Sequence, residues 1–151
     1  MPDAFIPSGA QDWIKDHVRR YLATDGEDGH IFLAPGNPAP MPALLLTTVG
    51  RRSGQKLILP LIYGRDGDNV VIVASRAGSP HHPSWFLNLI AQPQVEVQVL
   101  SDRFTARARV TEGEERHRLF AMMASILPNY IVYQEMTDRE LPVIVLERLP
   151  G

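Results

Sequence analysis

The feature that most constrains the fold of this chain is a series of short apolar segments joined by tight turns. Three of them, Leu44–Val49, Leu57–Tyr63 and Val70–Ser75, are rich in Leu, Ile and Val and have the length of β-strands. The basic turn Gly50–Gly54 separates the first two, and the Asp66–Asp68 turn predicts a hairpin between the second and the third. Strands joined this closely pair antiparallel, because a parallel pair needs a crossover of about a dozen residues or more.

The rest of the chain adds further elements around this antiparallel nucleus. The elements expected there are strands at Val95–Leu100, Arg103–Thr111 and Val143–Arg148 and helices at Pro83–Ile90 and Glu112–Leu127. Hairpins dominate and few parallel crossovers are available. The pattern therefore indicates an α+β fold that is mainly β, an antiparallel barrel with packed helices, rather than a Rossmann sheet.

The N-terminal segment has a different periodicity. Apolar residues recur at helical spacing between positions 13 and 22, opposite the basic residues Lys15 and Arg19. A loop rich in Gly, Pro and Asp follows, and we expect it to cross over the barrel. At 151 residues the chain is most simply one domain. Within it, residues 1–42 are expected to form the amphipathic helix and crossover loop, and residues 43–151 the barrel.

Composition argues against several classes of function. There is no cysteine, so there is no disulfide, thiolate metal site or cysteine nucleophile, which suits a reducing cytoplasm. The net charge of −2 gives no support to general nucleic-acid binding. The N-terminus lacks the basic start and apolar run of a signal peptide, and no apolar stretch has the length of a membrane span. The histidines are scattered without metal-ligand spacing, so we expect a cytoplasmic protein without a bound metal.

Polar side chains gather at the first turn and at the end of the third strand. Arg51, Arg52 and Ser53 form the tip of the turn, and guanidinium groups bind phosphate or carboxylate through paired hydrogen bonds. Ser75 and Arg76 follow a buried strand, at an end of the sheet where a ligand could lie. Each group also fits a plain solvated turn or loop, and the residue types alone do not decide between the two.

Two aromatic segments are candidates for contact with a flat ligand. Trp85 lies near a helix start, with Asn88 one turn later on the same face. A tryptophan at such a place is also a common core anchor. Tyr130 and Tyr133 share a face if their segment is helical, and a neutral phenol with a pKa of ~10 can donate a hydrogen bond or a proton. The alternative is a packing face whose hydroxyls point to water.

These segments occur in an order and spacing that resemble a known family. The matching segments are Thr47–Gly54, Pro60–Tyr63, Asp66–Asp68, Val73–Ser75 and Pro83–Leu89. The C-terminal part matches in Tyr130, Tyr133, Thr137, Asp138, Arg139 and Pro142. On these residues the chain resembles, over about residues 40–149, the deazaflavin-dependent nitroreductases, also called F420-dependent quinone reductases.

The resemblance implies a split β-barrel, similar to the FMN-binding oxidoreductases, that binds coenzyme F420, a deazaflavin with a phospholactate and polyglutamate tail. The cofactor-binding residues that it implies are Arg51, Arg52, Ser53, Lys56, Pro60, Ala74, Ser75, Arg76, Trp85 and Asn88. The three arginines of this set are implied to bind the anionic tail. Ser75, Trp85 and Asn88 are implied to lie beside the ring and its ribityl chain.

The same resemblance implies an oxidoreductase that transfers a hydride from the reduced deazaflavin to a quinone-like or nitroaromatic acceptor. Tyr130, Tyr133 and Ser75 are the catalytic residues that it implies, with both phenols on the acceptor side. Two alternatives remain at this point. One is a non-catalytic carrier of the deazaflavin, and the other is an FMN- or haem-binding protein of the related barrel.

Two positions depart from the family pattern. Leu57 stands where the family often has Arg, and the adjacent Lys56 points to the opposite face of a strand. Ile62 stands where the family often has Tyr. The first departure bears on how the tail is bound, and the second on the identity of the acceptor.

The amphipathic helix and the barrel surface are the candidate contacts with larger partners. The basic face of the helix, with Lys15, Arg19 and Arg20, suits peripheral contact with a membrane, where menaquinone-like acceptors are found. Packing of the apolar face against the barrel is the alternative interpretation. Pairing of two copies into a homodimer is a further candidate interaction.

Overall fold

The computed structural model describes residues 4–33 and 39–150. The strands are β1 (Ile31–Phe32), β2 (Met41–Val49), β3 (Lys56–Ile62), β4 (Gly64–Asp66), β5 (Asn69–Val73), β6 (Gln94–Val99), β7 (Asp102–Val110) and β8 (Val143–Arg148). The helices are α1 (Asp12–Thr24), the short 3-10 helix η1 (Arg76–Gly78), α2 (Ser84–Ala91), α3 (Gly113–Ile126) and α4 (Asn129–Glu135). All six strands and the three helices expected from the sequence are present.

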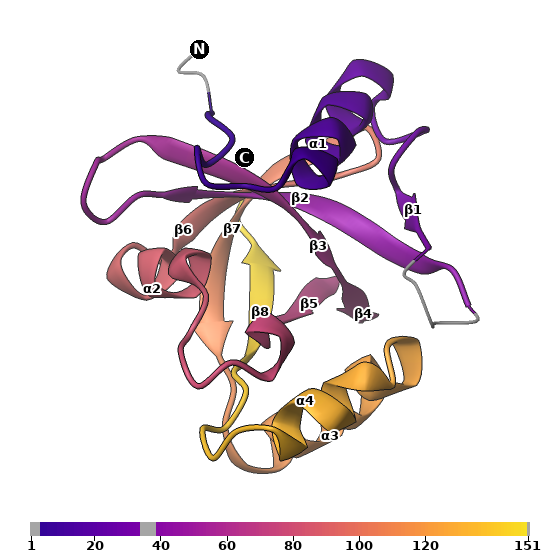
Figure 1. Ribbon diagram of the computed structural model, residues 1–151, viewed down its shortest axis with the longest axis vertical. Helices are drawn as coiled ribbons and strands as arrows, with labels where there is room; N and C mark the ends of the chain where they lie inside the picture. The colour runs from indigo at the N-terminus through magenta and orange to yellow at the C-terminus, as the bar shows by residue number, and fades with distance from the viewer. Residues whose placement is uncertain (1–3, 34–38, 151) are drawn as a thin grey trace.

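The sheet is antiparallel and curls into a barrel (Figure 1). Its strand order is β1-β2-β6-β7-β8-β5-β4, and β3 pairs with the remaining edge of β2. In the run β3-β2-β6-β7-β8-β5-β4, the strands β3 and β4 lie at opposite ends, yet they are consecutive in the chain, with Tyr63 between them. The chain itself thus joins the two ends of the curled sheet.

The predicted hairpin at the Asp66–Asp68 turn forms, but with a different first strand. The turn joins β5 to the three-residue strand β4, whereas β3 pairs along its length with β2. The chain changes direction next to Gly64, where an added Cβ would lie 2.8 Å from the sulfurs of Met122 and Met123 on α3. The apolar run of β3 ends at this bend, and the three residues of β4, Gly64–Asp66, carry no strand-like pattern of their own.

Apolar side chains fill three layers. The barrel interior holds Leu44, Leu46, Val70 and Ile72, whereas the alternate residue Leu45 packs against α1. Residues of β5 and β8 that point the other way pack under α3 and α4. A strand that is buried on both faces has apolar residues at successive positions, which explains the unbroken apolar sequences of β2 and β5. Each such side chain contributes about 1.5–3 kcal/mol on burial.

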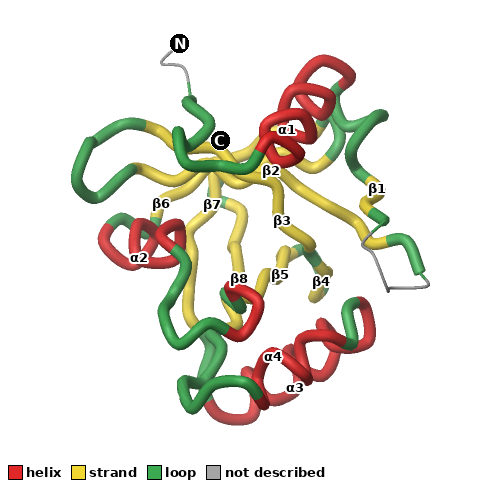
Figure 2. The backbone as a smooth tube through the Cα atoms, viewed as in Figure 1, coloured by secondary structure: helices red, strands yellow, loops and turns green. Residues whose placement is uncertain are grey.

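The helices enclose the sheet from several sides (Figure 2). In this view α1 lies on one side of the barrel and α3 and α4 on the opposite side. Val18 and Tyr21 of α1 are fully buried, and the Tyr21 hydroxyl accepts from the backbone N–H of Leu100 at 2.8 Å. Trp13, on the same helix, remains half exposed at 52%. No helix in the described parts of the chain is both long and apolar enough to cross a membrane.

Candidate functional site

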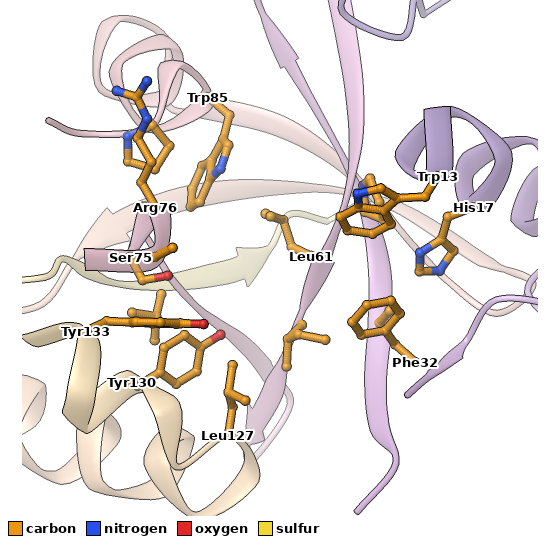
Figure 3. A pocket seen from close by; sticks show the side chains of 16 residues that line it. Trp13, His17, Phe32, Leu61, Ser75, Arg76, Trp85, Leu127, Tyr130 and Tyr133 are labelled. Carbon is orange, nitrogen blue, oxygen red and sulfur yellow. The ribbon is translucent and has the colours of Figure 1, made fainter. Parts of the chain in front are cut away.

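A cavity of about 350 Å³ opens between the barrel and the helices. Its wall draws on α1, β1, β3, the segment after β5, the start of α2, and α4. Figure 3 shows Ser75, Arg76, Tyr130 and Tyr133 on one side and Trp13, His17 and Phe32 on the other. The wall is mostly apolar, so its few polar groups determine what it can bind.

Tyr130 and Tyr133 lie together on α4. Their segment is helical, so the three-residue spacing places both rings on one face, 6.4 Å apart between centroids in an edge-to-face arrangement. Tyr130 is 4% exposed, and burial, followed by the nearby Tyr133, raises the pKa of its phenol far above the usual value. Neither hydroxyl has a hydrogen-bond partner within residues 4–33 and 39–150. Tyr130 therefore presents a neutral hydroxyl that is free to donate into the cavity.

The segment after β5 has an unusual backbone. Ser75 has right-handed helical angles, whereas Arg76 and Ala77 have positive φ values of 46° and 52°. Successive N–H groups in this arrangement converge into a concave binding surface for anions or partly negative oxygens. The N–H groups of these three residues donate to no acceptor in the described part of the chain, and all three residues line the cavity. We call these N–H groups the amide nest.

The start of α2 forms the next part of the wall. Trp85 is partly buried, packs against the barrel interior and also lines the cavity, so its side chain is both a core contact and part of the cavity surface. Arg76 is exposed at the rim, with Nη1 3.5 Å from the carbonyl oxygen of His82. This end of the cavity therefore combines an indole surface with a cationic group.

The cationic turn lies outside the cavity wall but contacts α2. Arg51 donates from Nη1 to Oδ1 of Asn88 at 2.8 Å and approaches the carbonyl of Ser84 at 3.4 Å. Asn88 is 3% exposed and is held by Arg51 and Thr48, not by its own helix alone. The hydrogen bonds of Asn88 thus attach the turn to the helix that carries Trp85.

The remaining predicted residues divide into two groups. Arg52 and Ser53 are exposed, and Lys56 pairs with Glu96 at 3.0 Å. Ala74 is fully buried behind the amide nest. Of the predicted set, the cavity wall brings together Pro60, Ser75, Arg76, Trp85, Tyr130 and Tyr133. Arg51, Arg52, Ser53, Lys56, Ala74 and Asn88 are not part of that wall.

The sequence reasoning missed the aromatic wall opposite the tyrosines. Phe32 stacks on Trp13 with ring centroids 5.7 Å apart and on His17 at 5.6 Å. The four-residue spacing of Trp13 and His17 was a signal that they share a helix face. Phe32 belongs to a two-residue strand that has no recognisable pattern of its own. Arg139, whose guanidinium donates to the carbonyls of Ala74 and Ser75, was also missed as a site residue.

The two departures from the family pattern lie in different places. Ile62 lines the cavity, so it contributes apolar surface where the family often has a phenol. Leu57 lies on the outer edge of β3, bridged to Phe5 of the N-terminal segment. Only the first departure reaches the cavity.

The described residues fit a flat cofactor with polar ring atoms and an anionic tail. The cavity has apolar and aromatic walls for a ring and an amide nest for its oxygens. Arg76 lies at the rim, and Arg51 lies against the same helix that carries Trp85. In contrast, residues 4–33 and 39–150 contain no group of three or more His, Asp or Glu side chains arranged to hold a metal ion.

Comparison with known proteins gives consistent matches. Residues 13–148 match the family described as F420H(2)-dependent quinone reductase. A protein named F420H(2)-dependent quinone reductase from Mycobacterium tuberculosis (strain ATCC 25618 / H37Rv) is 39% identical over 135 residues, which cover 87% of each chain.

Solved structures also match the chain in sequence and fold. One described as an F420-H2 dependent reductase is 39% identical, covers 70% of this chain and 94% of its own, and has a TM-score of 0.66. Another, described as a domain-swapped dimer, is 36% identical, covers 90% and 98%, and has a TM-score of 0.68. The haem storage protein HutZ from Vibrio cholerae, at 17% identity over 72% of this chain and 82% of its own, shares the fold alone, with a TM-score of 0.57. These matches confirm the predicted split barrel, and the chain belongs to the F420H(2)-dependent quinone reductase family.

Proposed function

We propose that this protein is an oxidoreductase that uses reduced coenzyme F420 to reduce a quinone-type acceptor. The observation that carries the proposal is one cavity in which two phenols and an amide nest face apolar and aromatic walls. The names of the 39% identical relative and of the solved reductase support the choice of cofactor and acceptor. Nitroaromatic compounds, which are also flat and electron-poor, are proposed as further substrates of the same cavity.

The residues proposed to hold the cofactor lie at one end of the cavity. Trp85 offers the ring an aromatic surface, and the amide nest offers hydrogen bonds to its oxygens. Arg76 at the rim, with Arg51 and Arg52 on the neighbouring turn, supplies positive charge for the anionic tail. When bound, the reduced deazaflavin supplies a hydride. The protein holds the ring and the acceptor in contact and excludes water from between them.

The tyrosines are proposed to act on the acceptor. Reduction of a quinone places negative charge on its oxygen, and a phenol hydroxyl aimed at that oxygen stabilises the transition state more than the ground state. Burial keeps the Tyr130 phenol protonated, which makes it a hydrogen-bond donor at any physiological pH. Ser75, whose N–H belongs to the amide nest, offers a further hydroxyl at the cavity wall.

The alternative functions are a non-catalytic deazaflavin carrier and an FMN- or haem-binding protein of the same barrel. The test is anaerobic titration of the purified protein with reduced coenzyme F420, FMN and haem, followed by turnover of a soluble quinone. We expect the tightest binding for the deazaflavin and multiple turnovers. Binding without turnover identifies a carrier, and tighter binding of FMN or haem contradicts the proposed cofactor.

We also propose that the protein is cytoplasmic and touches the membrane surface when it meets a lipid-soluble quinone. Support comes from Trp13, which is 52% exposed at the cavity wall, and from the basic residues Lys15 and Arg19 on the same helix. Binding to vesicles that contain anionic lipid, compared between the protein and its Trp13→Ala variant, tests this contact. Equal binding of both proteins contradicts a role for Trp13.

A homodimer is proposed as the assembly, supported by the 36% identical neighbour described as a domain-swapped dimer. Within each copy we propose one domain, because the buried residues of α1 pack against β2 and β3. Light scattering across a range of protein concentrations tests the dimer, and a monomeric mass at all concentrations contradicts it.

A further inference from the structure

Arg139 lies behind the cavity wall and contacts the segment that forms it. Its guanidinium donates to the carbonyl oxygens of Ser75 at 2.7 Å, Ser79 at 2.8 Å and Ala74 at 3.2 Å. Nη1 also lies 3.2 Å from Nδ1 of His82. All four partners belong to residues 74–82, the segment that carries the amide nest. A single side chain therefore ties down this whole segment.

The segment needs such support because its backbone is disfavoured. Arg76 and Ala77 adopt left-handed conformations in which the Cβ of an ordinary residue approaches the following carbonyl. The segment makes only two internal backbone bonds, from Gly78 to Ser75 and from Ser79 to Arg76. Without outside contacts, a more open backbone would be favoured and the nest N–H groups would no longer converge.

The same segment also packs directly on the helix of the tyrosines. Gly78 has a φ of 78°, and an added Cβ there would lie 2.9 Å from the carbonyl oxygen of Tyr133. Gln134, the next residue of α4, donates from Nε2 to the carbonyl of Arg139 at 2.8 Å. Arg139 is thus anchored to α4 while its guanidinium holds the neighbouring segment 74–82, on the same side of the cavity as the tyrosines (Figure 3).

We propose that Arg139 is a positioning residue that keeps the amide nest formed and fixes its place relative to Tyr133. It does so through the carbonyls of residues 74–82 and does not contact the ligand. The effect of Arg139 on turnover rests on the proposed function, in which the amide nest binds the cofactor and Tyr133 faces the acceptor. Its structural role is independent of that assignment.

The chemistry of the contacts explains why the residue is an arginine. Three carbonyl oxygens and one imidazole nitrogen surround a planar group whose donors point outward in fixed directions. A lysine ammonium can reach only some of these acceptors at once, and a glutamine side chain has two donors and no charge. The Arg139→Lys and Arg139→Gln variants should therefore form a graded series.

The first experiment measures binding of reduced coenzyme F420 and soluble-quinone turnover in both variants. Arg118→Gln is the matched control, because Arg118 is an exposed arginine of α3 that donates two hydrogen bonds to Asp66. We expect Arg139→Gln to weaken cofactor binding at least tenfold and to lower kcat, with Arg139→Lys intermediate and the control within twofold of the parent. Parent-like binding and kcat in folded Arg139→Gln overturn the proposal.

A rescue variant separates local positioning from general destabilisation. Glycine adopts left-handed angles freely, so Ala77→Gly should restore part of the affinity lost in Arg139→Gln. No gain in affinity from the added glycine contradicts the claim that Arg139 acts through this backbone. If Arg139→Gln does not fold, the same comparison is made in Arg139→Lys.

Hydrogen exchange in the ligand-free protein tests the structural claim without any turnover. The amides of Gly78 and Ser79 donate within the segment, so Arg139→Lys should lose protection there while the barrel strands keep theirs. Unchanged protection overturns the proposal. If the parent protein fails to bind or use reduced coenzyme F420, the proposed function is wrong, and the exchange result still decides the role of Arg139.

Discussion

At the scale of single residues, the two tyrosines of α4 are similar in position and different in environment. Tyr130 is almost fully buried, whereas Tyr133 is half-buried and nearer to the rim. Burial raises the pKa of Tyr130, so its hydroxyl stays protonated and acts as a fixed donor. Tyr133 is more accessible to solvent, which fits its proposed role beside the acceptor.

Replacing Tyr133 with Phe removes only the hydroxyl. We expect a drop of about 10–100-fold in kcat for a soluble quinone, equivalent to about 1.4–2.8 kcal/mol of transition-state stabilisation, with cofactor affinity nearly unchanged. Tyr130→Phe should show a smaller loss. Tyr63→Phe is the control, because it removes a hydroxyl 2.8 Å from His30, outside the cavity wall. Full activity in the Tyr130/Tyr133 double variant shows that the proton comes from solvent.

His82 gives a pH-dependent contribution to stability. Burial, and then the positive charge of Arg139, lower the pKa of His82 below its usual value. The His82 imidazole therefore takes up a proton at a higher pH in the unfolded chain than in the folded protein. The contribution of His82 to the free energy of unfolding is present at neutral pH and falls as the pH drops through about 6.5 towards the lower pKa of the folded state.

Denaturant unfolding between about pH 7.5 and 5 measures this effect. The His82→Gln variant should lose less stability over that interval than the parent. The slope will not vanish, because burial and Arg65 lower the pKa of His30 in the same way. His117→Gln, at an exposed position of α3, is the control and should keep the parent slope. Identical slopes in the parent and His82→Gln contradict the prediction.

At the scale of elements, the basic turn and α2 behave as one unit. Oδ1 of Asn88 accepts from both the backbone N–H and the side chain of Arg51. Arg51 is therefore engaged in holding the turn, whereas Arg52 makes no ion pair or side-chain hydrogen bond in the described part of the chain. The two arginines should differ in how they affect binding of an anionic tail.

Substituting each arginine with Ala separates these roles. Arg52→Ala should weaken binding of reduced coenzyme F420 by about 1 kcal/mol and reduce the salt dependence, because its charge acts through solvent. Arg51→Ala should cost up to about 3 kcal/mol, because it also frees Asn88 and the turn. Titrations at two salt concentrations measure both effects. Equal losses with equal salt dependence would falsify the distinction. Arg103→Ala, at the start of β7 and outside the cavity wall, serves as the control.

Most elements were predictable because burial leaves a clear pattern in the sequence. Residues Leu44–Leu46 lie between the interior and α1, so the run is apolar throughout and reads as a strand. The hairpin partner of β5 was not predictable, because β4 has only the three residues Gly64–Asp66 and follows the end of the β3 run with no strand pattern of its own. The two-residue β1 was missed because its exposed Ile31 has no periodicity to detect.

The site was predictable in part for similar reasons. Ser75, Arg76, Trp85 and the tyrosines lie at element ends whose motifs are local in sequence. The stack of Trp13 and Phe32 depends on how α1 packs across the barrel, and nothing local encodes that arrangement. The sequence motif includes Arg139 but does not show that its side chain reaches back to residues 74–82.

At the scale of the whole molecule, α1 is part of the core. Val18 and Tyr21 are 0% exposed, and the Tyr21 hydroxyl ties the helix to the carbonyl of Ala43 and the amide of Leu100. Loss of one large buried side chain costs about 3–5 kcal/mol, while a typical domain has only about 5–15 kcal/mol in total.

Removing residues 1–24 should therefore abolish cooperative folding. Thermal unfolding followed by circular dichroism should show no cooperative transition for the truncated chain, whereas the double variant Lys15→Gln/Arg19→Gln, changed only on the outer face of α1, should melt like the parent. A truncated chain that retains a sharp transition shows that the helix is an appendage. In that case its contact with membranes becomes the better explanation of its sequence.

The borders of the sheet carry a consequence for self-association. Unpaired strand edges can pair with another chain and start aggregation. Two of the edge strands in this barrel are very short, because β1 has two residues and β4 has three. Beyond β3, the backbone of Phe5 bonds to Lys56 and Ile58 and occupies part of that border. The few residues before α1 therefore cover part of the β3 edge and hinder edge-to-edge pairing with another copy. Chains cleaved by a protease just after Phe5 should precipitate on storage before intact chains do.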